Sequence, residues 1–337
     1  MSRLAAAASG SLRRTPVDAL TIRRRRRGRG FEYLDAGGRR LTDAATLARI
    51  RALAIPPAYR EVRIARQPDA HLQAVGRDDA GRLQYRYHPD WEVVRERRKC
   101  AQLADFCAAL PKIRGRIARD LRTRGLPRER VLAAVVTLID RTHIRIGCED
   151  YVHSGRSRGA ATLLKRNVRC RGERVALGFN GKGGREIRCE IASAPLARAI
   201  ASLGRLPGQR LFQYRDGNGR LRRVTAGEVN LYLQEIAGAP VSAKNFRTLA
   251  ASAAAAKILA RTAPAGSRSA RRRQIAAVVA EIAGMLGNTP AVARKSYVLD
   301  EVLDAFKSGR LQAICSGEAV RGLKRGEASI RRLVDGG

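Results

Sequence analysis

The sequence predicts an α+β protein with a small β-rich domain, residues 19–92, and a larger, mainly helical domain, residues 93–337. Over residues 62–88, short runs of β-branched and aromatic residues alternate with turn residues, as in antiparallel strands. From Trp91 the apolar residues recur with a 3.6-residue period, which indicates a helix and a domain boundary. A shorter β section interrupts the helical pattern before it resumes at Leu196.

The chain begins with basic segments. Residues 1–18 are expected to form a flexible basic arm. A run of five arginines, residues 23–27, follows it, and such a run is either solvated or binds phosphate. Leu41-Thr42-Asp43 then opens a short helix that ends before Pro56 and Pro57.

The last strand of the first domain, residues 82–87, has two different faces. Tyr85 and Tyr87 share one face, while Gln84 and Arg86 share the other. One interpretation is a strand that offers hydrogen bonds to a groove. The other is an ordinary edge strand whose tyrosines pack on a small sheet.

Two cations stand out in the middle of the chain. Arg145 lies between two isoleucines at the end of a predicted helix, so either an acidic side chain or a bound phosphate should meet its guanidinium. Lys182 lies at the tip of the hairpin turn Asn180-Gly181-Lys182-Gly183-Gly184, whose glycines permit positive φ angles. This turn is not a P-loop, because the spacing differs and no Ser or Thr follows the lysine. A solvated turn lysine is the simpler interpretation. The strands of this β section are predicted at residues 161–164, 168–170, 175–179 and 185–191.

The C-terminal part is predicted to be helical over residues 226–236, 250–260 and 275–286, with a basic linker at 267–273. Thr289 and Pro290 then form a strong helix start, because the hydroxyl can cap a free N–H and proline suits the first helical position. Tyr297 is expected two turns into that helix. By itself it is either a phenol aimed at a phosphate or a partly buried structural tyrosine.

Composition favours a polyphosphate partner. The 67 Lys and Arg residues against 30 Asp and Glu give a net charge of +37, while 45% hydrophobic residues allow ordinary cores. Only nine of the basic residues are lysines. Because arginine does not release its proton in proteins, each lysine is a candidate for proton transfer.

No metal, membrane or export signal is expected. The six cysteines include no C-x-x-C pair, and the four histidines form no zinc motif. No apolar run approaches 18 residues, and no signal-peptide pattern is present. Free thiols and the lack of an export signal then predict a cytoplasmic protein.

Five residues occur in an order, and at rough spacings, that one enzyme family shares: Arg145, Lys182, Arg247, Asn288 and Tyr297. By these residues the chain resembles the type IB DNA topoisomerases of the poxvirus-like bacterial branch. The resemblance covers about residues 30–305 and includes the N-terminal segments Ile55-Pro56-Pro57, His71-Leu72-Gln73-Ala74, Gly76-Arg77-Asp78 and Gly81-Arg82-Leu83-Gln84-Tyr85-Arg86-Tyr87.

The resemblance implies a C-shaped clamp around duplex DNA and an enzyme that relaxes supercoils without cofactor, metal or nucleotide. Tyr297 would be the nucleophile that forms a 3′-phosphotyrosyl intermediate. Arg145, Arg247 and Asn288 would stabilise the transition state, and Lys182 would be the general acid, with Lys244 as a possible assistant. We expect a monomer, and we assign DNA contacts to Arg82, Gln84, Tyr85, Tyr87 and Tyr151.

Two positions depart from the family pattern. Many members carry histidine where this chain has Asn288, although a bacterial subgroup shares the asparagine, which still donates one hydrogen bond. Poxvirus members place a DNA-contacting lysine where this chain has Ala80, so cleavage-site preference is expected to differ.

Three other protein classes are weighed against this hypothesis. Tyrosine recombinases share the chemistry, but they carry His-x-x-Arg where this chain has Lys244-Asn245-Phe246-Arg247. A non-enzymatic basic DNA-packaging protein explains the charge but not the five spaced residues. A metal-dependent nuclease or topoisomerase would need clustered carboxylates, and the acidic pairs at 78–79, 149–150 and 300–301 match no ligand motif.

Overall fold

The computed structural model of the protein describes residues 12–149 and 157–336. Tyr151, expected to contact DNA, therefore lies outside the described residues. The chain divides into two units, Met1–Arg98 and Lys99–Gly337, and together they confirm the α+β class.

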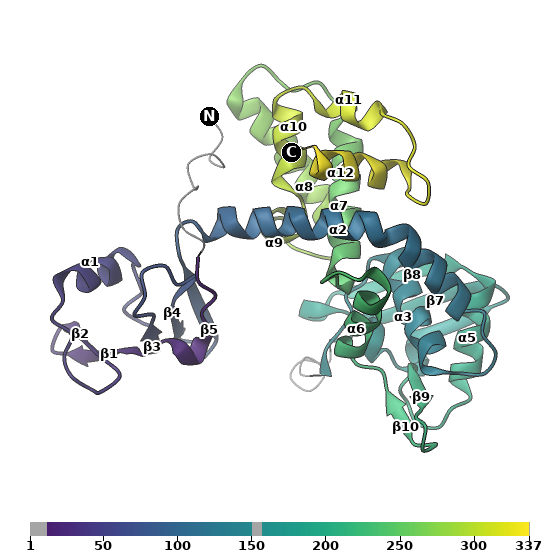
Figure 1. Cartoon of the computed structure of the whole chain (residues 1–337), viewed down its shortest axis with the longest axis horizontal. Helices are drawn as coiled ribbons and strands as arrows, with labels where there is room; N and C mark the ends of the chain where they lie inside the picture. The colour runs from purple at the N-terminus through teal and green to yellow at the C-terminus, as the bar shows by residue number, and fades with distance from the viewer. Residues whose placement is uncertain (1–11, 150–156, 337) are drawn as a thin grey trace. The chain divides into compact units, whose positions relative to one another are not determined.

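The first unit is built on a five-stranded antiparallel sheet with the order β2-β1-β3-β4-β5 (Figure 1). The predicted short helix is confirmed as α1 (Ala44–Ala52), and Asp43 caps it by accepting a hydrogen bond from the N–H of Thr46. Ile50 of α1 is buried against Ile22 and Ile64 of the sheet. The strands are β1 (Ile22–Arg27), β2 (Gly30–Leu34), β3 (Arg60–Ile64), β4 (Leu72–Arg77) and β5 (Leu83–Tyr87).

The run of five arginines forms most of strand β1, and part of it is structural. The guanidinium of Arg24 donates to the backbone carbonyls of Ile55 and Pro56 at 3.3 and 3.1 Å, and its Cζ lies 4.1 Å from the ring centroid of Phe31. Arg25 donates to Glu32 on β2 at 2.7 Å. At these positions the arginines hold the sheet and the adjoining loop together.

The prediction of a flexible arm is wrong for residues 12–18. Leu12 and Thr15 are buried. The N–H of His71 donates to the carbonyl of Arg13 at 2.9 Å, and the N–H of Thr15 donates to Nδ1 of His71 at 3.0 Å. The sequence pattern gave no sign of this docking, because the segment is basic and its partner lies more than 50 residues away.

The second unit is mainly helical. Its first helix, α2 (Trp91–Asp120), confirms the predicted helix start and contains the boundary between the units. Its β section is a three-stranded antiparallel sheet of β6 (Val168–Arg171), β7 (Arg174–Asn180) and β8 (Glu186–Ala192), and a two-stranded hairpin of β9 (Gln213–Arg215) and β10 (Leu221–Arg223). The predicted strand at 161–164 is wrong, because its first two residues belong to the 3-10 turn η2 (Ala160–Thr162) and its last two connect η2 to η3 (Lys165–Asn167).

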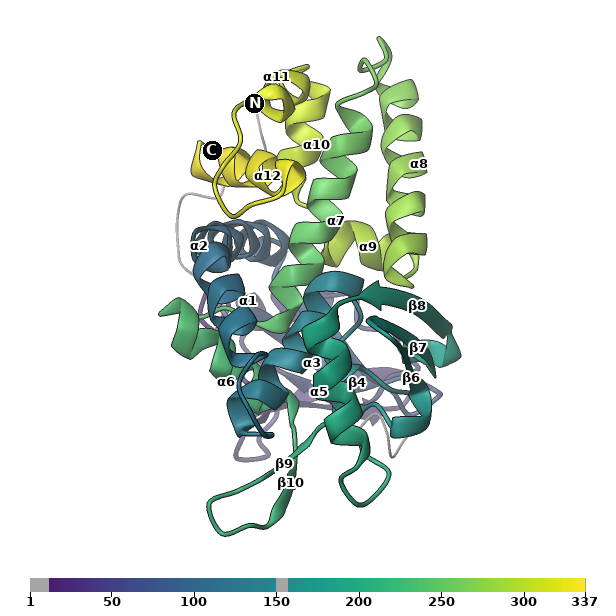
Figure 2. The ribbon, with the colours of Figure 1, turned by 90° about the vertical axis from the view of Figure 1, so that its right-hand side faces the viewer.

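Helix α7 (Ala243–Leu259) is the central element of this unit. It runs between α8 (Arg268–Leu286) on one side and α10 (Asp300–Lys307) and α12 (Arg325–Asp335) on the other (Figure 2). Its many alanines permit this close packing. The other elements are α3 (Arg128–Thr142), β6 (Val168–Arg171), β7 (Arg174–Asn180), η4 (Lys182–Gly184), β8 (Glu186–Ala192), α5 (Ala194–Gly204), β9 (Gln213–Arg215), β10 (Leu221–Arg223), α6 (Ala226–Ala237), α9 (Pro290–Ser296) and α11 (Leu311–Ser316).

The predicted linker at residues 267–273 is also wrong, because these residues are the cap and first turns of α8. The Ser267 hydroxyl accepts a hydrogen bond from the N–H of Ala270, and arginine is a good helix former. In the described part of the chain, no single helix is long and apolar enough to cross a membrane. Only α8 and α9 together meet the length and composition criteria, as a pair bent by 94°.

Candidate active site

A tightly packed loop fixes Arg145. Helix α3 ends at Thr142, and the φ angle of its C-cap His143, 56°, is left-handed. The N–H groups of Ala160 and Ala161 donate to the carbonyls of Arg145 and Ile146, each at 2.8 Å. A Cβ at Gly159 would lie 2.4 Å from the Arg145 carbonyl oxygen, so only glycine fits there.

Arg247 projects from the first turn and a half of α7 and is 4% exposed. Its guanidinium donates to the backbone carbonyl of His143 and, at 3.0 Å, to that of Leu286. These two carbonyls close the ends of α3 and α8, so Arg247 ties three helices together. Among the described residues its Nε is buried with no hydrogen-bond partner. Burial lowers the pKa of the guanidinium, which keeps its charge because arginine does not deprotonate in proteins.

Asn288 occupies the turn between α8 and α9. Helix α8 ends at Gly287, where φ is 61°, and the N–H of Asn288 donates to the carbonyl of Ala283 at 2.8 Å. Oδ1 of Asn288 accepts a hydrogen bond from the guanidinium of Arg145. Its Nδ2 is buried and has no hydrogen-bond partner within the described residues. The sequence predicted that an acidic side chain or a bound phosphate would meet Arg145. Within the protein, the group that accepts its hydrogen bond is the neutral amide oxygen of Asn288.

Tyr297 lies just beyond α9, not inside it as expected. The predicted start of α9 at Thr289 and Pro290 is confirmed, but the helix ends at Ser296, and Tyr297 is its C-cap with φ −130° and ψ −33°. The hydroxyl of Ser252 on α7 donates to the Tyr297 carbonyl at 3.0 Å and accepts from the N–H of Leu299 at 3.1 Å. This contact fixes the backbone where the chain leaves the helix.

The phenol of Tyr297 is 8% exposed, and Cζ of Arg247 lies 4.9 Å from its ring centroid. Nζ of Lys244 lies 5.9 Å from the same centroid. Burial alone would raise the pKa of the phenol, but the positive charges of Arg247, Arg145 and Lys244 outweigh it, and the net pKa is lowered. The surroundings therefore favour the phenolate.

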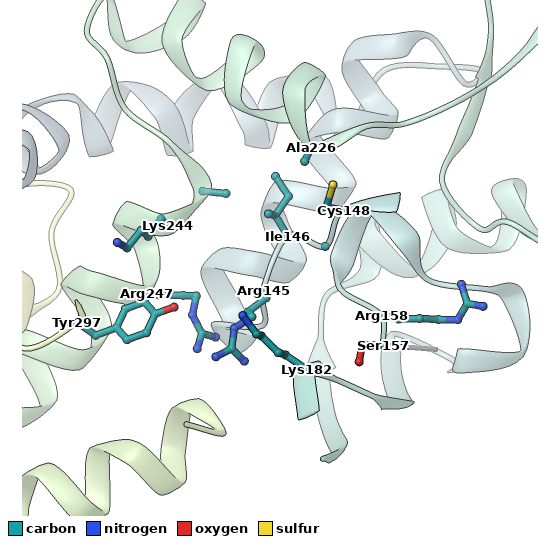
Figure 3. A pocket seen from close by; sticks show the side chains of 12 residues that line it. Arg145, Ile146, Cys148, Ser157, Arg158, Lys182, Ala226, Lys244, Arg247 and Tyr297 are labelled. Atoms are coloured by element: carbon teal, nitrogen blue, oxygen red, sulfur yellow. The ribbon is translucent and has the colours of Figure 1, made fainter. Parts of the chain in front are cut away.

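These side chains line one pocket of about 260 Å³. Figure 3 shows the ends of Arg145, Arg247 and Lys182 gathered beside the hydroxyl of Tyr297. The other described residues that line this pocket are Ile146, Gly147, Cys148, Ser157, Arg158, Ala226, Ala243 and Lys244. Among the twelve lining residues that the structure describes, five are cationic and none is acidic, so the pocket is suited to a phosphate group. Over residues 12–149 and 157–336, no three His, Cys, Asp or Glu side chains gather as a metal site.

The structure thus brings together Arg145, Lys182, Lys244, Arg247 and Tyr297 in the pocket, and Asn288 contacts Arg145 beside it. Lys182 is confirmed in the turn between β7 and β8. Their chemical roles stay predictions.

The residues assigned to DNA contact in the first unit lie on and beside β5. Tyr85 and Tyr87 are 46% and 44% exposed and stack with ring centroids 6.2 Å apart, and Tyr87 stacks on Trp91 at 5.9 Å. On the other side of the strand, Asp78 accepts hydrogen bonds from Arg82 and Gln84, each at 2.9 Å. The tyrosine face is open to a partner, whereas Gln84 and Arg82 already share an acceptor.

Sequence reasoning missed Ser252, Arg185 and Arg158, of which Arg158 lines the pocket. Ser252 was hidden in an alanine-rich helix, and only its contact with Tyr297 distinguishes it. Arg185 follows the Lys182 turn and donates to the backbone carbonyl of Asn288 at 3.0 Å. In a chain this rich in arginine, no local signal could have singled it out.

A tyrosine phenol among cations, with buried donors able to meet phosphate oxygens, is the arrangement expected of a protein that transfers phosphodiesters through a tyrosine. Residues 89–313 match the family model for the catalytic core of eukaryotic DNA topoisomerase I, and residues 30–78 match that for the N-terminal domain of bacterial DNA topoisomerase IB. The chain is 31% identical over 294 residues to the DNA topoisomerase 1B of Acanthamoeba polyphaga mimivirus, covering 85% of this chain and 88% of the relative. The chain therefore belongs to the type IB DNA topoisomerases, enzymes that act on DNA.

Proposed function

We propose that this chain relaxes positively and negatively supercoiled duplex DNA by cutting one strand transiently and rejoining it. The observation that carries the proposal is the buried Tyr297 phenol beside Arg247 in a pocket whose described lining residues include five cations and no carboxylate. Between cleavage and religation, the cut strand can rotate about the intact one in the direction set by either sign of torque.

Tyr297 is the nucleophile. Its phenolate oxygen forms a bond to the phosphorus, and the bond from phosphorus to the 5′ oxygen of the next nucleotide breaks. Lys182 donates a proton to that departing oxygen, so the products are a 3′-phosphotyrosyl link and a 5′-hydroxyl. Religation is the reverse reaction. No nucleotide is required, because the new phosphodiester preserves the energy of the broken one.

Arg145 and Arg247 balance the negative charge that grows on the non-bridging oxygens. Nδ2 of Asn288 and Nε of Arg247 are buried and have no hydrogen-bond partner in the part of the chain that the structure describes. They support this assignment, because buried donors without acceptors cost free energy until a ligand satisfies them. Lys244, 5.9 Å from the Tyr297 ring, assists through its positive charge and as a possible proton relay. This chemistry uses side chains in place of a metal ion.

The exposed tyrosines of β5 contact the duplex, and Arg82, Gln84 and Tyr151 add further contacts. The net charge of +37 supplies a non-specific attraction to phosphates. We further propose that the protein acts as a monomer, in the cytoplasm and associated with the nucleoid.

The test is relaxation of a supercoiled plasmid in EDTA without nucleotide. We expect wild-type protein to relax plasmids of either sign and to leave a covalent protein–DNA adduct when quenched with denaturing detergent. Tyr297→Phe keeps the ring and its contact with Arg247, so it should bind DNA but form no adduct. Strict dependence on magnesium would contradict the metal-free chemistry, and an adduct in Tyr297→Phe would assign the nucleophile to another residue.

A further inference from the structure

The loop that carries Lys182 is closed by one residue pair at its base. The N–H of Gly181 donates to the carbonyl of Arg185 at 2.8 Å, and the N–H of Gly184 donates to the carbonyl of Gly181 at 3.1 Å. Gly183 and Gly184 have φ angles of 76° and 73°, a conformation that other residues rarely adopt. Residues 182–185 are exposed, so the packing of their side chains does little to restrain the loop.

Arg185 joins this loop to the turn between α8 and α9. Its guanidinium donates to the backbone carbonyl of Asn288 at 3.0 Å, across 103 residues of sequence. The side chain of the same asparagine accepts from Arg145. One residue, Asn288, is therefore bonded both to the loop of the proton donor and to a guanidinium of the phosphate site.

We propose that Arg185 is a positioning residue for Lys182, which it holds in reach of the departing 5′ oxygen by tethering the loop to Asn288. This inference rests on the proposed function, because it takes Lys182 as the general acid. A general acid works only within hydrogen-bond distance of the atom it protonates. A loop with two glycines in the left-handed region visits other positions when the tether is removed, and the fraction of productive encounters falls.

A different role for the same guanidinium would be direct contact with a DNA phosphate. The two roles predict different chemistry. A residue that acts through the general acid becomes unimportant when the leaving group needs no proton. A cation on the phosphate remains important with any leaving group, and its removal weakens DNA binding.

The experiment compares single-turnover cleavage of two duplex oligonucleotides, one with the normal 5′ bridging oxygen and one with sulfur in its place. A thiolate departs without protonation, since the pKa of a thiol is far below that of an alcohol. On the oxygen substrate, Arg185→Met should be about tenfold slower than wild type, the effect of one charge-assisted hydrogen bond that is partly exposed. On the sulfur substrate it should match wild type. Arg185→Lys keeps a hydrogen-bond donor, so its cleavage rate on the oxygen substrate should lie between the rates of Arg185→Met and wild type.

Three controls make the outcome decisive. Arg188→Met removes an exposed cation from the same hairpin, bonded to Glu186 at 2.7 Å, and should cleave both substrates like wild type. The double variant Lys182→Ala/Arg185→Met should be no slower on oxygen than Lys182→Ala, because the tether has nothing left to position. DNA affinity at several salt concentrations should be the same for Arg185→Met and Arg188→Met.

The results distinguish a failure of this inference about Arg185 from a failure of the proposed function. If sulfur fails to rescue Lys182→Ala, the assignment of the general acid is wrong. If sulfur rescues Lys182→Ala but not Arg185→Met, or if Arg185→Met cleaves the oxygen substrate at the wild-type rate, Arg185 does not position Lys182. Additive losses in the double variant would likewise overturn the proposal.

Discussion

Arg145 and Asn288, 143 residues apart in the chain, share a hydrogen bond in which the guanidinium donates to the amide oxygen. The bond determines which way the amide points. With Oδ1 occupied by Arg145, Nδ2 is left as a buried donor without an acceptor in the described residues, at the place where a phosphate would supply one. We therefore expect Asn288 to supply the hydrogen bond that the sequence comparison assigns to the histidine of many members.

The first prediction concerns that donor. Asn288→Asp keeps an oxygen for Arg145 but replaces the Nδ2 donor by an anionic oxygen. We expect cleavage to slow by about 10²- to 10³-fold or more, the loss expected for one donor to a developing oxyanion plus repulsion of the phosphate. Asn288→Ala should lose about 10²-fold, and Asn288→His, which restores an N–H, should recover part of the rate. Single-turnover cleavage at fixed pH measures this, and a wild-type rate in Asn288→Asp would show that Nδ2 does not meet the phosphate.

The second prediction concerns pH. The pKa of Tyr297 is lowered because nearby positive charges outweigh burial. Below that pKa, the phenolate fraction rises about tenfold per pH unit, so cleavage should rise with pH and level off below the ordinary tyrosine value of about 10. Arg247→Met removes the nearest charge and should move the inflection to higher pH, besides lowering the maximum rate. Asn288→Ala is the control, since loss of a neutral group should lower the rate and leave the inflection in place. An unchanged inflection in Arg247→Met would contradict the electrostatic explanation.

The chemistry of the site was predictable from the sequence to the extent that it depends on residue type. A tyrosine, two arginines, a lysine and an asparagine in the order found in a known family predict phosphodiester transfer, and the pocket brings the tyrosine and the charged members together. The hairpin around Lys182 and the start of α9 were predictable because glycine and proline leave local signals.

What failed to follow from the sequence depends on contacts between distant residues. Tyr297 was expected inside a helix, yet α9 ends before it, and Ser252 of α7 bonds the backbone there, 45 residues away. Arg185 reaches Asn288 across 103 residues. Residues 12–18 resemble a disordered arm in composition, yet bonds to Asp69 and His71 and the burial of Leu12 and Thr15 fix them. No local pattern encodes such pairs.

The third prediction concerns stability. Arg114 on α2 bonds Asp140 on α3 and Glu327 on α12, each at 2.8 Å, and all three side chains are largely buried. Arg114→Ala would remove the cation that Asp140 and Glu327 share, leaving Glu327 with the more distant Lys324 at 3.8 Å, and should lower the free energy of unfolding by about 3 kcal/mol. Arg331→Ala, which breaks an exposed pair with Asp335, should change it by less than about 1 kcal/mol. Urea denaturation followed by circular dichroism measures both, and equal effects would show that the Arg114 network adds nothing beyond a surface pair.

The last prediction uses Trp91, the one tryptophan of the sequence. Trp91 stacks on Tyr87, which stacks on the exposed Tyr85, so a duplex that contacts the tyrosines should change the fluorescence of Trp91. Tyr85→Ala should weaken DNA affinity about tenfold, equivalent to ~1.4 kcal/mol, because a stacked aromatic surface is lost. Tyr85→Phe keeps the ring and should retain most of that affinity.

The same variants separate DNA binding from catalysis. In a covalent complex already formed on a duplex oligonucleotide, religation by Tyr85→Ala should proceed at close to the wild-type rate, because β5 belongs to the first unit and the pocket residues to the second. Religation is measured by adding an acceptor strand with a 5′-hydroxyl. If religation slowed as much as cleavage, or if the fluorescence of Trp91 did not respond to duplex DNA, β5 would have a structural role and the DNA contacts would have to lie elsewhere on this cationic protein.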